Sequence, residues 1–78
     1  MPVGEVSTAT GIETTPEALI LVLASRRVSI PWGRCSAKLA RATPAERNHA
    51  ELSPGGYGIH WPLLDEDLSI SGLLRVAR

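Results

Sequence analysis

The 78-residue sequence contains no phenylalanine, and its aromatic residues are two tryptophans and one tyrosine. Leucine, isoleucine, valine and alanine must therefore fill the core, with the two tryptophans and the tyrosine supplying much of the aromatic burial. A chain this short forms one small domain, whose core rarely supplies more than about 3–5 kcal/mol of net stability. We therefore expect Trp32 and Trp61 to be structural residues of that core.

The sequence also has little cysteine and no long apolar run. Cys35 is the single cysteine, which excludes an internal disulfide and a metal site built on paired cysteines. The residues near the N-terminus do not contain a basic cluster followed by an apolar run, so the sequence predicts no signal peptide. The longest apolar run, residues 18–24, is much shorter than the roughly 20 residues of a membrane helix. These observations predict a cytoplasmic protein with no membrane partner.

The sequence has no net charge, because eight basic residues balance eight acidic ones. Net charge therefore does not predict a polyanionic partner. The charges are nevertheless grouped along the chain, and no acidic residue interrupts one basic stripe. Its members are Arg26, Arg27, Arg34, Lys38 and Arg41. Such a stripe could bind nucleic acid or an acidic partner, although a solvated helix face explains it equally well.

Two strands are predicted in the first half of the chain. Residues 18–24 are apolar throughout, and in residues 27–32 Val28, Ile30 and Trp32 alternate with polar residues, the period of a half-buried strand. Residues 11–14 could add a short edge strand. Residues 1–10 are mostly small and polar, and we interpret them as a flexible lead-in to a single domain over residues 11–78.

Two helices are predicted next. Residues 33–42 have a helical period, with an apolar face that includes Cys35 and Leu39 and a basic face that includes Arg34 and Lys38. A second helix should begin after Thr43, because a proline follows it and Glu46 completes a capping box.

The last third of the chain predicts a turn, a strand and a helix. Gly56 and Gly58 belong to a tight turn. Residues 57–61 are a predicted strand with Tyr57, Ile59 and Trp61 on one face and His60 on the other. Ser69 should cap a last helix, with the acidic triplet of residues 65–67 just before its N-terminus, where carboxylates suit the helix dipole.

This order of elements predicts an α+β fold, a small antiparallel sheet with two or three short helices packed on one face.

Several of these segments resemble one protein family. They are VSIPW at residues 28–32, LARAT at residues 39–43 with Arg47 after it, and GIHWP through DEDLS to GLL over residues 58–74. The sequence resembles the bacterial domain-of-unknown-function family 2442. The resemblance covers roughly residues 11–74 and implies a small α+β domain. It also implies that some relatives carry a helix-turn-helix domain, and that others are encoded beside a second small protein, similar to toxin–antitoxin pairs.

The sequence departs from the family pattern in two places. Ser25-Arg26-Arg27 stands where the family often has Asp-Gly-Arg at its first hairpin, so a turn glycine is replaced and a charge is added. The sequence ends at Arg78, so we expect no DNA-binding domain after this one. The family implies no catalytic residues.

Two chemical alternatives can be weighed from the residues. His60 with Asp65, Glu66 and Asp67 offers one imidazole and three carboxylates, but their spacing matches no metal motif. We therefore expect no metal and no cofactor, with Asp65 instead stabilising a turn. Cys35 could act as a nucleophile with His49 or His60 as base, but its place on an apolar helix face predicts an inert thiol.

The sequence therefore favours a non-enzymatic protein-interaction module, as the antitoxin-like partner of a second small protein. Its candidate partner-binding residues are Tyr57, His60, Glu66 and Asp67. A nucleic-acid-binding regulator that uses the basic stripe is the alternative, and a small metal-binding protein or enzyme is the third. Self-association as a homodimer is compatible with each of these functions.

Overall fold

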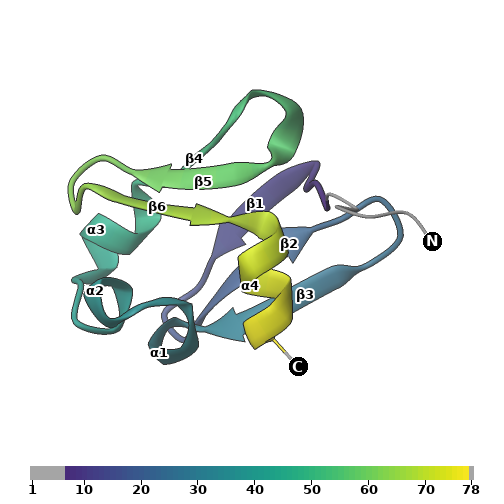
Figure 1. Cartoon of the computed structure of the whole chain (residues 1–78). Coiled ribbons are helices and arrows are strands. Elements are labelled where there is room, and N and C mark those ends of the chain that lie inside the picture. The colour runs from purple at the N-terminus through teal and green to yellow at the C-terminus, as the bar shows by residue number, and fades with distance from the viewer. Residues whose placement is uncertain (1–6, 78) are drawn as a thin grey trace.

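The structure is a computed structural model of the chain and describes residues 7–77 (Figure 1). Part of the predicted lead-in, residues 1–6, lies outside the described residues. The first sheet contains β1 (Gly11–Thr14), β2 (Ala18–Val22) and β3 (Arg27–Pro31), antiparallel and in that order. All three strands agree with the sequence prediction.

The second sheet contains β4 (Glu51–Leu52), β5 (Gly58–Trp61) and β6 (Glu66–Ser69), again antiparallel and in chain order. The helices are short: α1 (Trp32–Cys35), α2 (Ala37–Ala40), α3 (Pro44–Asn48), the 3₁₀ turn η1 (Pro54–Gly56) and α4 (Ile70–Val76). The α+β class is confirmed, and the strands are divided between two small sheets where the sequence suggested a single one. No helix within residues 7–77 has the length and apolar character needed to span a bilayer.

The single helix predicted over residues 33–42 is wrong, because Ser36 divides it into α1 and α2. Ser36 has an extended backbone with φ −171° and ψ 163°, and its hydroxyl accepts the Leu39 N–H at 3.1 Å. A serine that caps a following helix competes with continuation of the preceding one. The other two caps are confirmed: Thr43 and Glu46 form a capping box on α3, and Ser69 caps α4 through the Gly72 N–H.

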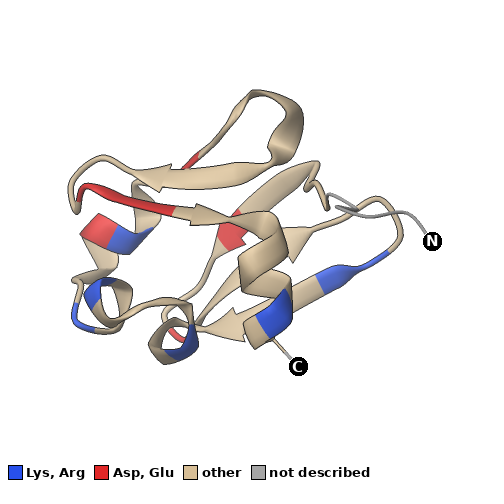
Figure 2. Ribbon diagram, viewed as in Figure 1, with Lys and Arg blue, Asp and Glu red and all other residues tan. Residues whose placement is uncertain are grey.

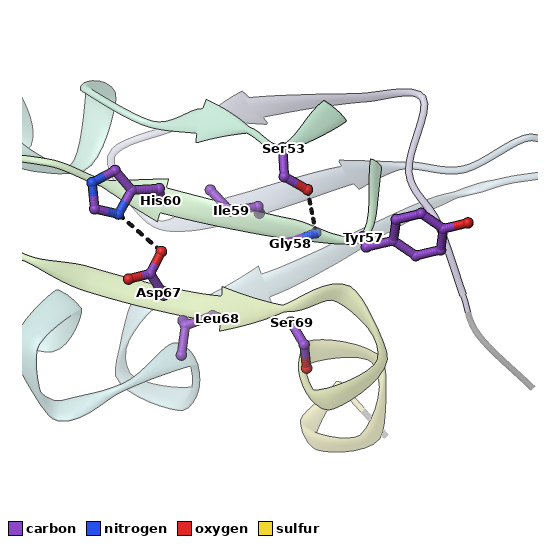
Figure 3. A pocket seen from close by; sticks show the side chains of 8 residues that line it. All are labelled: Ser53, Tyr57, Gly58, Ile59, His60, Asp67, Leu68 and Ser69. Carbon is purple, nitrogen blue, oxygen red and sulfur yellow. Dashed lines mark hydrogen bonds and ion pairs between the residues drawn. The ribbon is translucent and has the colours of Figure 1, made fainter. Parts of the chain in front are cut away.

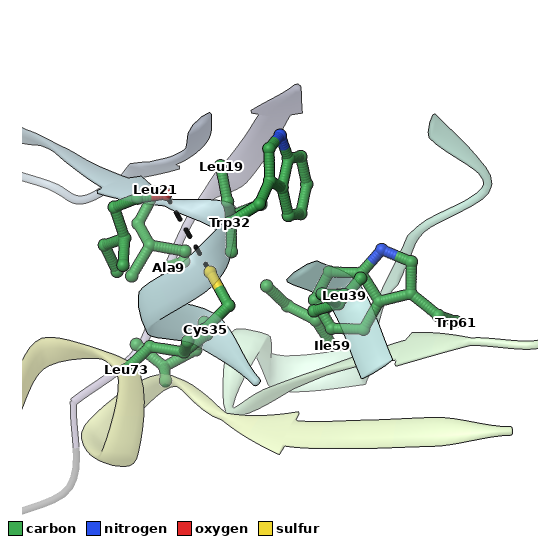
Figure 4. Packing of buried hydrophobic residues seen from close by; sticks show 11 residues of the cluster. Ala9, Leu19, Leu21, Trp32, Cys35, Leu39, Ile59, Trp61 and Leu73 are labelled. Carbon is green, nitrogen blue, oxygen red and sulfur yellow. Dashed lines mark hydrogen bonds between the residues drawn. The ribbon is translucent and has the colours of Figure 1, made fainter. Parts of the chain in front are cut away.

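The core lies between the two sheets and is covered by the short helices (Figures 1 and 4). The rings of Trp32 and Trp61 pack edge to face, with centroids 6.5 Å apart and planes at 80°. Each indole N–H has a partner: Trp32 Nε1 donates to the Thr15 carbonyl at 2.9 Å, and Trp61 Nε1 donates to the Arg47 carbonyl at 3.1 Å. The two tryptophans are therefore both buried and hydrogen-bonded.

Arg47 joins α2, α3 and the core, a role that sequence reasoning missed. Its Nε donates to the Leu39 carbonyl at 2.9 Å and its Nη2 to the Ala40 carbonyl at 3.0 Å, both at the C-terminus of α2. Its guanidinium carbon lies 5.3 Å from the centre of the Trp32 ring, within cation–π range. Arg47 thus donates hydrogen bonds to carbonyl groups at the C-terminus of α2 and covers the indole of Trp32.

Gly56 connects the two sheets through the backbone. It has φ +76°, and its carbonyl accepts the Ala9 N–H at 2.8 Å. A side chain at this position would place its Cβ only 2.1 Å from the Ala9 carbonyl oxygen. The segment that leads into β1 therefore packs directly on η1, with Ala9 buried.

Candidate functional site: a hollow on the outer face of β5 and β6

The acidic triplet lies in a β-hairpin and not at a helix start, so that part of the prediction is wrong. Asp65 occupies the turn between β5 and β6 with φ +51°, a left-handed conformation that Asp tolerates better than most residues. Residues 66–69 then pair with β5, which places Asp67 opposite His60 and Leu68 opposite Ile59. The segment was hard to recognise as a strand because only Leu68 in it is apolar.

Tyr57 does not share the buried face of Ile59 and Trp61, which corrects a second prediction. It follows η1 in a helical conformation, with φ −89° and ψ −22°, so strand alternation begins only at Gly58. As a result its side chain is 53% exposed, whereas Ile59 and Trp61 are buried.

A hollow of about 360 Å³ lies over β5, β6 and the turn that leads into β5 (Figure 3). Gly58 contributes no side chain to its floor, and a Cβ there would lie 3.3 Å from the Leu68 carbonyl oxygen. The Ser53 hydroxyl accepts the Gly58 N–H at 2.9 Å, which fixes the floor to the preceding turn. We call this site the outer hollow; its lining residues are Ser53, Tyr57, Gly58, Ile59, His60, Asp67, Leu68 and Ser69.

One polar pair lies beside this hollow. His60 Nδ1 is 2.9 Å from Asp67 Oδ1, and the two side chains are 40% and 75% exposed. Glu51 of β4 is the other cross-strand neighbour of His60, so a carboxylate lies on each side of the imidazole in register. No group of three His, Cys, Asp or Glu side chains in residues 7–77 is arranged to hold a metal ion.

Three of the four candidate partner-binding residues come together, because Tyr57, His60 and Asp67 all line the outer hollow. Glu66 does not join them, since it pairs with Trp61 and its side chain belongs to the other face of β6. The predicted structural residues lie nearby: Gly56 in η1, Gly58 in the floor, Asp65 in the hairpin turn and Ser69 at the cap of α4.

The basic residues are divided between two places (Figure 2). Arg26 and Arg27 lie at the β2–β3 hairpin, where Arg27 forms an ion pair with Glu13. The other three lie on and just after α1 and α2. Lys38 Nζ donates to the carbonyls of Leu64 and Asp65, at 3.2 Å each. Arg34 Nη1 donates to the Val76 carbonyl at 2.9 Å. Arg34 and Lys38 thus connect the helices to α4 and to the β5–β6 turn.

The second sheet carries only one sign of formal charge. No Lys or Arg occurs between Arg47 and Arg75, whereas this stretch contains four carboxylates, Glu51, Asp65, Glu66 and Asp67. Figure 2 shows these acidic positions along β4 and β6, with the basic positions on the helices and β3. Of these four, Glu51 and Asp67 share the outer face with His60, so this face is locally negative although the chain has zero net charge.

Cys35 lies apart from this site, on the core side of α1. Its side chain is buried, and its Sγ lies 3.8 Å from the Ile30 carbonyl oxygen (Figure 4). Burial raises the pKa of the thiol to about 11, against a smaller lowering by the nearby Arg47 charge. At neutral pH the group is a protonated thiol, which is a poor nucleophile.

We expect a thiol reagent to label Cys35 slowly in the native protein and quickly after denaturant is added. Because the folded-state pKa is raised from 9.0 to about 11, the protonated thiol favours the folded state. This contribution is fully present below pH 9 and is lost as the pH rises through about 11. Cys35→Ala should remove that part of the alkaline loss of stability, measured by urea unfolding at several pH values. Rapid native-state labelling at neutral pH would contradict this description of Cys35.

Fold and site together define a small α+β domain in which two three-stranded sheets enclose one core and a negative hollow lies on the outside of the second sheet. The chain belongs to the family described as protein of unknown function (DUF2442), which it matches over residues 9–78. The family prediction from the sequence is thereby confirmed.

Two solved structures are similar to the chain. A protein of unknown function from Rhodospirillum rubrum, determined by crystallography, shares 27% identity with a TM-score of 0.78, covering 91% of this chain and 88% of that one. An uncharacterised protein from Chromobacterium violaceum, determined by NMR, shares 28% identity with a TM-score of 0.73, covering 92% of this chain and 68% of that one. Comparison with curated proteins finds no match.

Proposed function

We propose that this domain is a non-enzymatic protein-interaction module, and that it is the antitoxin-like partner of a second small protein encoded beside it. The outer hollow is the observation that carries the proposal. It combines a mostly apolar floor, an exposed tyrosine and a negative rim on one face. Exposed aromatic side chains next to a concavity are typical of residues that contribute strongly to protein–protein binding.

The chemistry of the side chains supports binding over catalysis. Cys35 is buried with a raised pKa and lines no part of the outer hollow. His60 lies on an exposed strand face, and its hydrogen bond is to the Asp67 carboxylate and not to a hydroxyl or thiol that it could activate. The hollow is open to solvent, so it lacks the water-excluded surroundings that strengthen electrostatic catalysis.

The test is co-expression of the tagged chain with the product of the neighbouring gene. Two exposed apolar residues provide a matched pair: Tyr57, 53% exposed at the hollow, and Leu63, 57% exposed in the β5–β6 turn. We expect the unchanged chain and Leu63→Ser to retain the partner. Tyr57→Ser should weaken binding by about tenfold or more, as for a central interface aromatic.

Failure of the unchanged chain to co-purify with that product would contradict the proposed function. Equal loss in Tyr57→Ser and Leu63→Ser would contradict the use of the outer hollow. Salt-sensitive DNA binding that disappears when Arg26 and Arg41 are changed to Glu would favour the nucleic-acid-binding regulator instead.

A further inference from the structure

The free side of β6 has backbone groups available for another strand. The Ile70 N–H donates to the Tyr57 carbonyl at 2.9 Å, and the Ser53 N–H donates to the Gly58 carbonyl at 2.8 Å. In an antiparallel sheet, alternate residues direct both backbone groups to the same neighbouring strand. Residues 66, 68 and 70 therefore bond to β5, and the N–H and C=O of Asp67 point away from it. Within residues 7–77, β6 is an edge strand of its sheet, since β5 is the one strand that pairs with it.

A second hollow, also of about 360 Å³, lies on the other side of β6. Asp67, Leu68 and Ser69 line both hollows, so β6 is the boundary between them. The remaining lining of this second site, the inner hollow, comes from α1 and α4. It consists of Cys35, Gly72, Leu73 and Val76, of which Val76 is 40% exposed.

An extended segment beside β6 would place successive side chains in these two hollows. Side chains of neighbouring strand residues point to opposite faces of a sheet. A residue opposite Asp67 would direct its side chain to the outer face, beside the Asp67 carboxylate. The residues before and after it would direct theirs to the inner hollow, against Leu73 and Val76. The two hollows thus suit a segment in which side chains of two different kinds alternate along the sequence.

The charged groups around β6 determine which side chains such a segment should carry. The outer face around Asp67 has carboxylates and no Lys or Arg from its own sheet, so it favours a cationic side chain. The inner hollow differs, because Arg75 Nη2 reaches within 3.9 Å of the Cβ position of Gly72. That charge disfavours a second cation there and leaves the apolar surface for an aliphatic side chain. A second copy of β6 fits poorly, since pairing would bring Glu66 and Asp67 of the two copies together.

We propose that β6 binds an extended segment of the partner as a fourth strand, with a Lys or Arg opposite Asp67 and aliphatic residues on either side. This inference rests on the proposed function, since it gives the partner's recognition chemistry. Backbone hydrogen bonds to Asp67 supply affinity, and the two hollows supply specificity, as in other cases of strand addition.

The test uses a pentapeptide probe, acetyl-Thr-Val-Arg-Val-Thr-amide, titrated into the isotope-labelled chain and followed by amide NMR. We expect shifts at Asp67, Leu68, Tyr57 and Gly58, and slower solvent exchange of the Asp67 N–H in the bound state. The matched probe with Glu in place of Arg should bind about fivefold more weakly, because like charges would then lie opposite each other.

Two variants separate the side-chain and backbone contributions. Asp67→Asn should make the two peptides bind equally. Asp67→Pro removes the outward N–H while sparing the bonds to β5, and should weaken both peptides further. The Asp67 exchange measurement on the unchanged chain needs no variant, so a misfolded Asp67→Pro leaves the inference testable.

Shifts confined to the β2–β3 hairpin, no preference for Arg over Glu, or concentration-dependent shifts of the free chain at β6 would each overturn the inference. Because the peptide titration does not involve the neighbouring gene product, its result is independent of the co-expression result. If the chain co-purifies with its partner but binds neither peptide, the proposed function stands and the binding site at β6 is contradicted.

Discussion

Trp61→Ala is expected to leave the domain largely unfolded. Trp61 is fully buried, packs edge to face on Trp32, and donates its indole N–H to the Arg47 carbonyl at 3.1 Å. Removing a buried tryptophan costs about 3–5 kcal/mol. The same range is the whole net stability expected for a core of this size. Far-UV circular dichroism in a urea titration should therefore show little or no folded baseline.

Trp61→Phe is the matched control for this variant. It keeps an aromatic ring in the core but leaves the Arg47 carbonyl without its donor. We expect a loss of about 1–3 kcal/mol from the unsatisfied acceptor and the smaller ring, with a cooperative transition retained. A Trp61→Ala protein with an unchanged urea midpoint would show that the core does not depend on this side chain.

Gly56→Ala is expected to have the second largest effect. Alanine at φ +76° adopts a conformation that costs roughly 1–2 kcal/mol. Its Cβ would also lie 2.1 Å from the Ala9 carbonyl oxygen, a backbone atom that cannot turn away. The segment before β1 must then separate from η1. We expect a total loss above about 2 kcal/mol, measured by urea unfolding, with faster hydrogen exchange of the Ala9 N–H.

Gly55→Ala isolates the two contributions. Gly55 also has a positive φ, +84°, but a Cβ there would meet the ring of Tyr57, an exposed side chain that can rotate. This variant should therefore lose only the stability that alanine costs at a positive φ. Its Ala9 N–H should still exchange slowly with solvent. Equal destabilisation by the two substitutions would show that the contact between Gly56 and Ala9 is unimportant.

The predictable parts of the fold are those in which local sequence alone decides the structure. The apolar run of β2, the alternation of β3 and the caps at Thr43 and Ser69 all follow from period or side-chain chemistry. β6 was not predictable in this way, because Glu66, Asp67 and Ser69 have no strand pattern and are ordered by pairing with β5.

The sequence predicts which residues belong to the site better than it predicts how they are arranged in space. Tyr57, His60 and Asp67 could be selected from their types and proximity along the chain, but their meeting at one hollow depends on the register of β5 and β6. The basic stripe shows the opposite case. Its residues lie close together in the sequence, yet the extended β3 separates the hairpin arginines from the helical residues, and the extended Ser36 divides Arg34 from Lys38.

Each sheet consists of strands that follow one another directly along the chain. Closing such short connections costs little chain entropy, so either hairpin pair can form early and independently. The contacts of Ala9 with Gly56 and of Trp32 with Trp61, which join the two halves of the domain, link residues far apart in the sequence. Docking of one preformed meander on the other is therefore the expected rate-limiting event of folding, and substitutions at these two contacts should slow it.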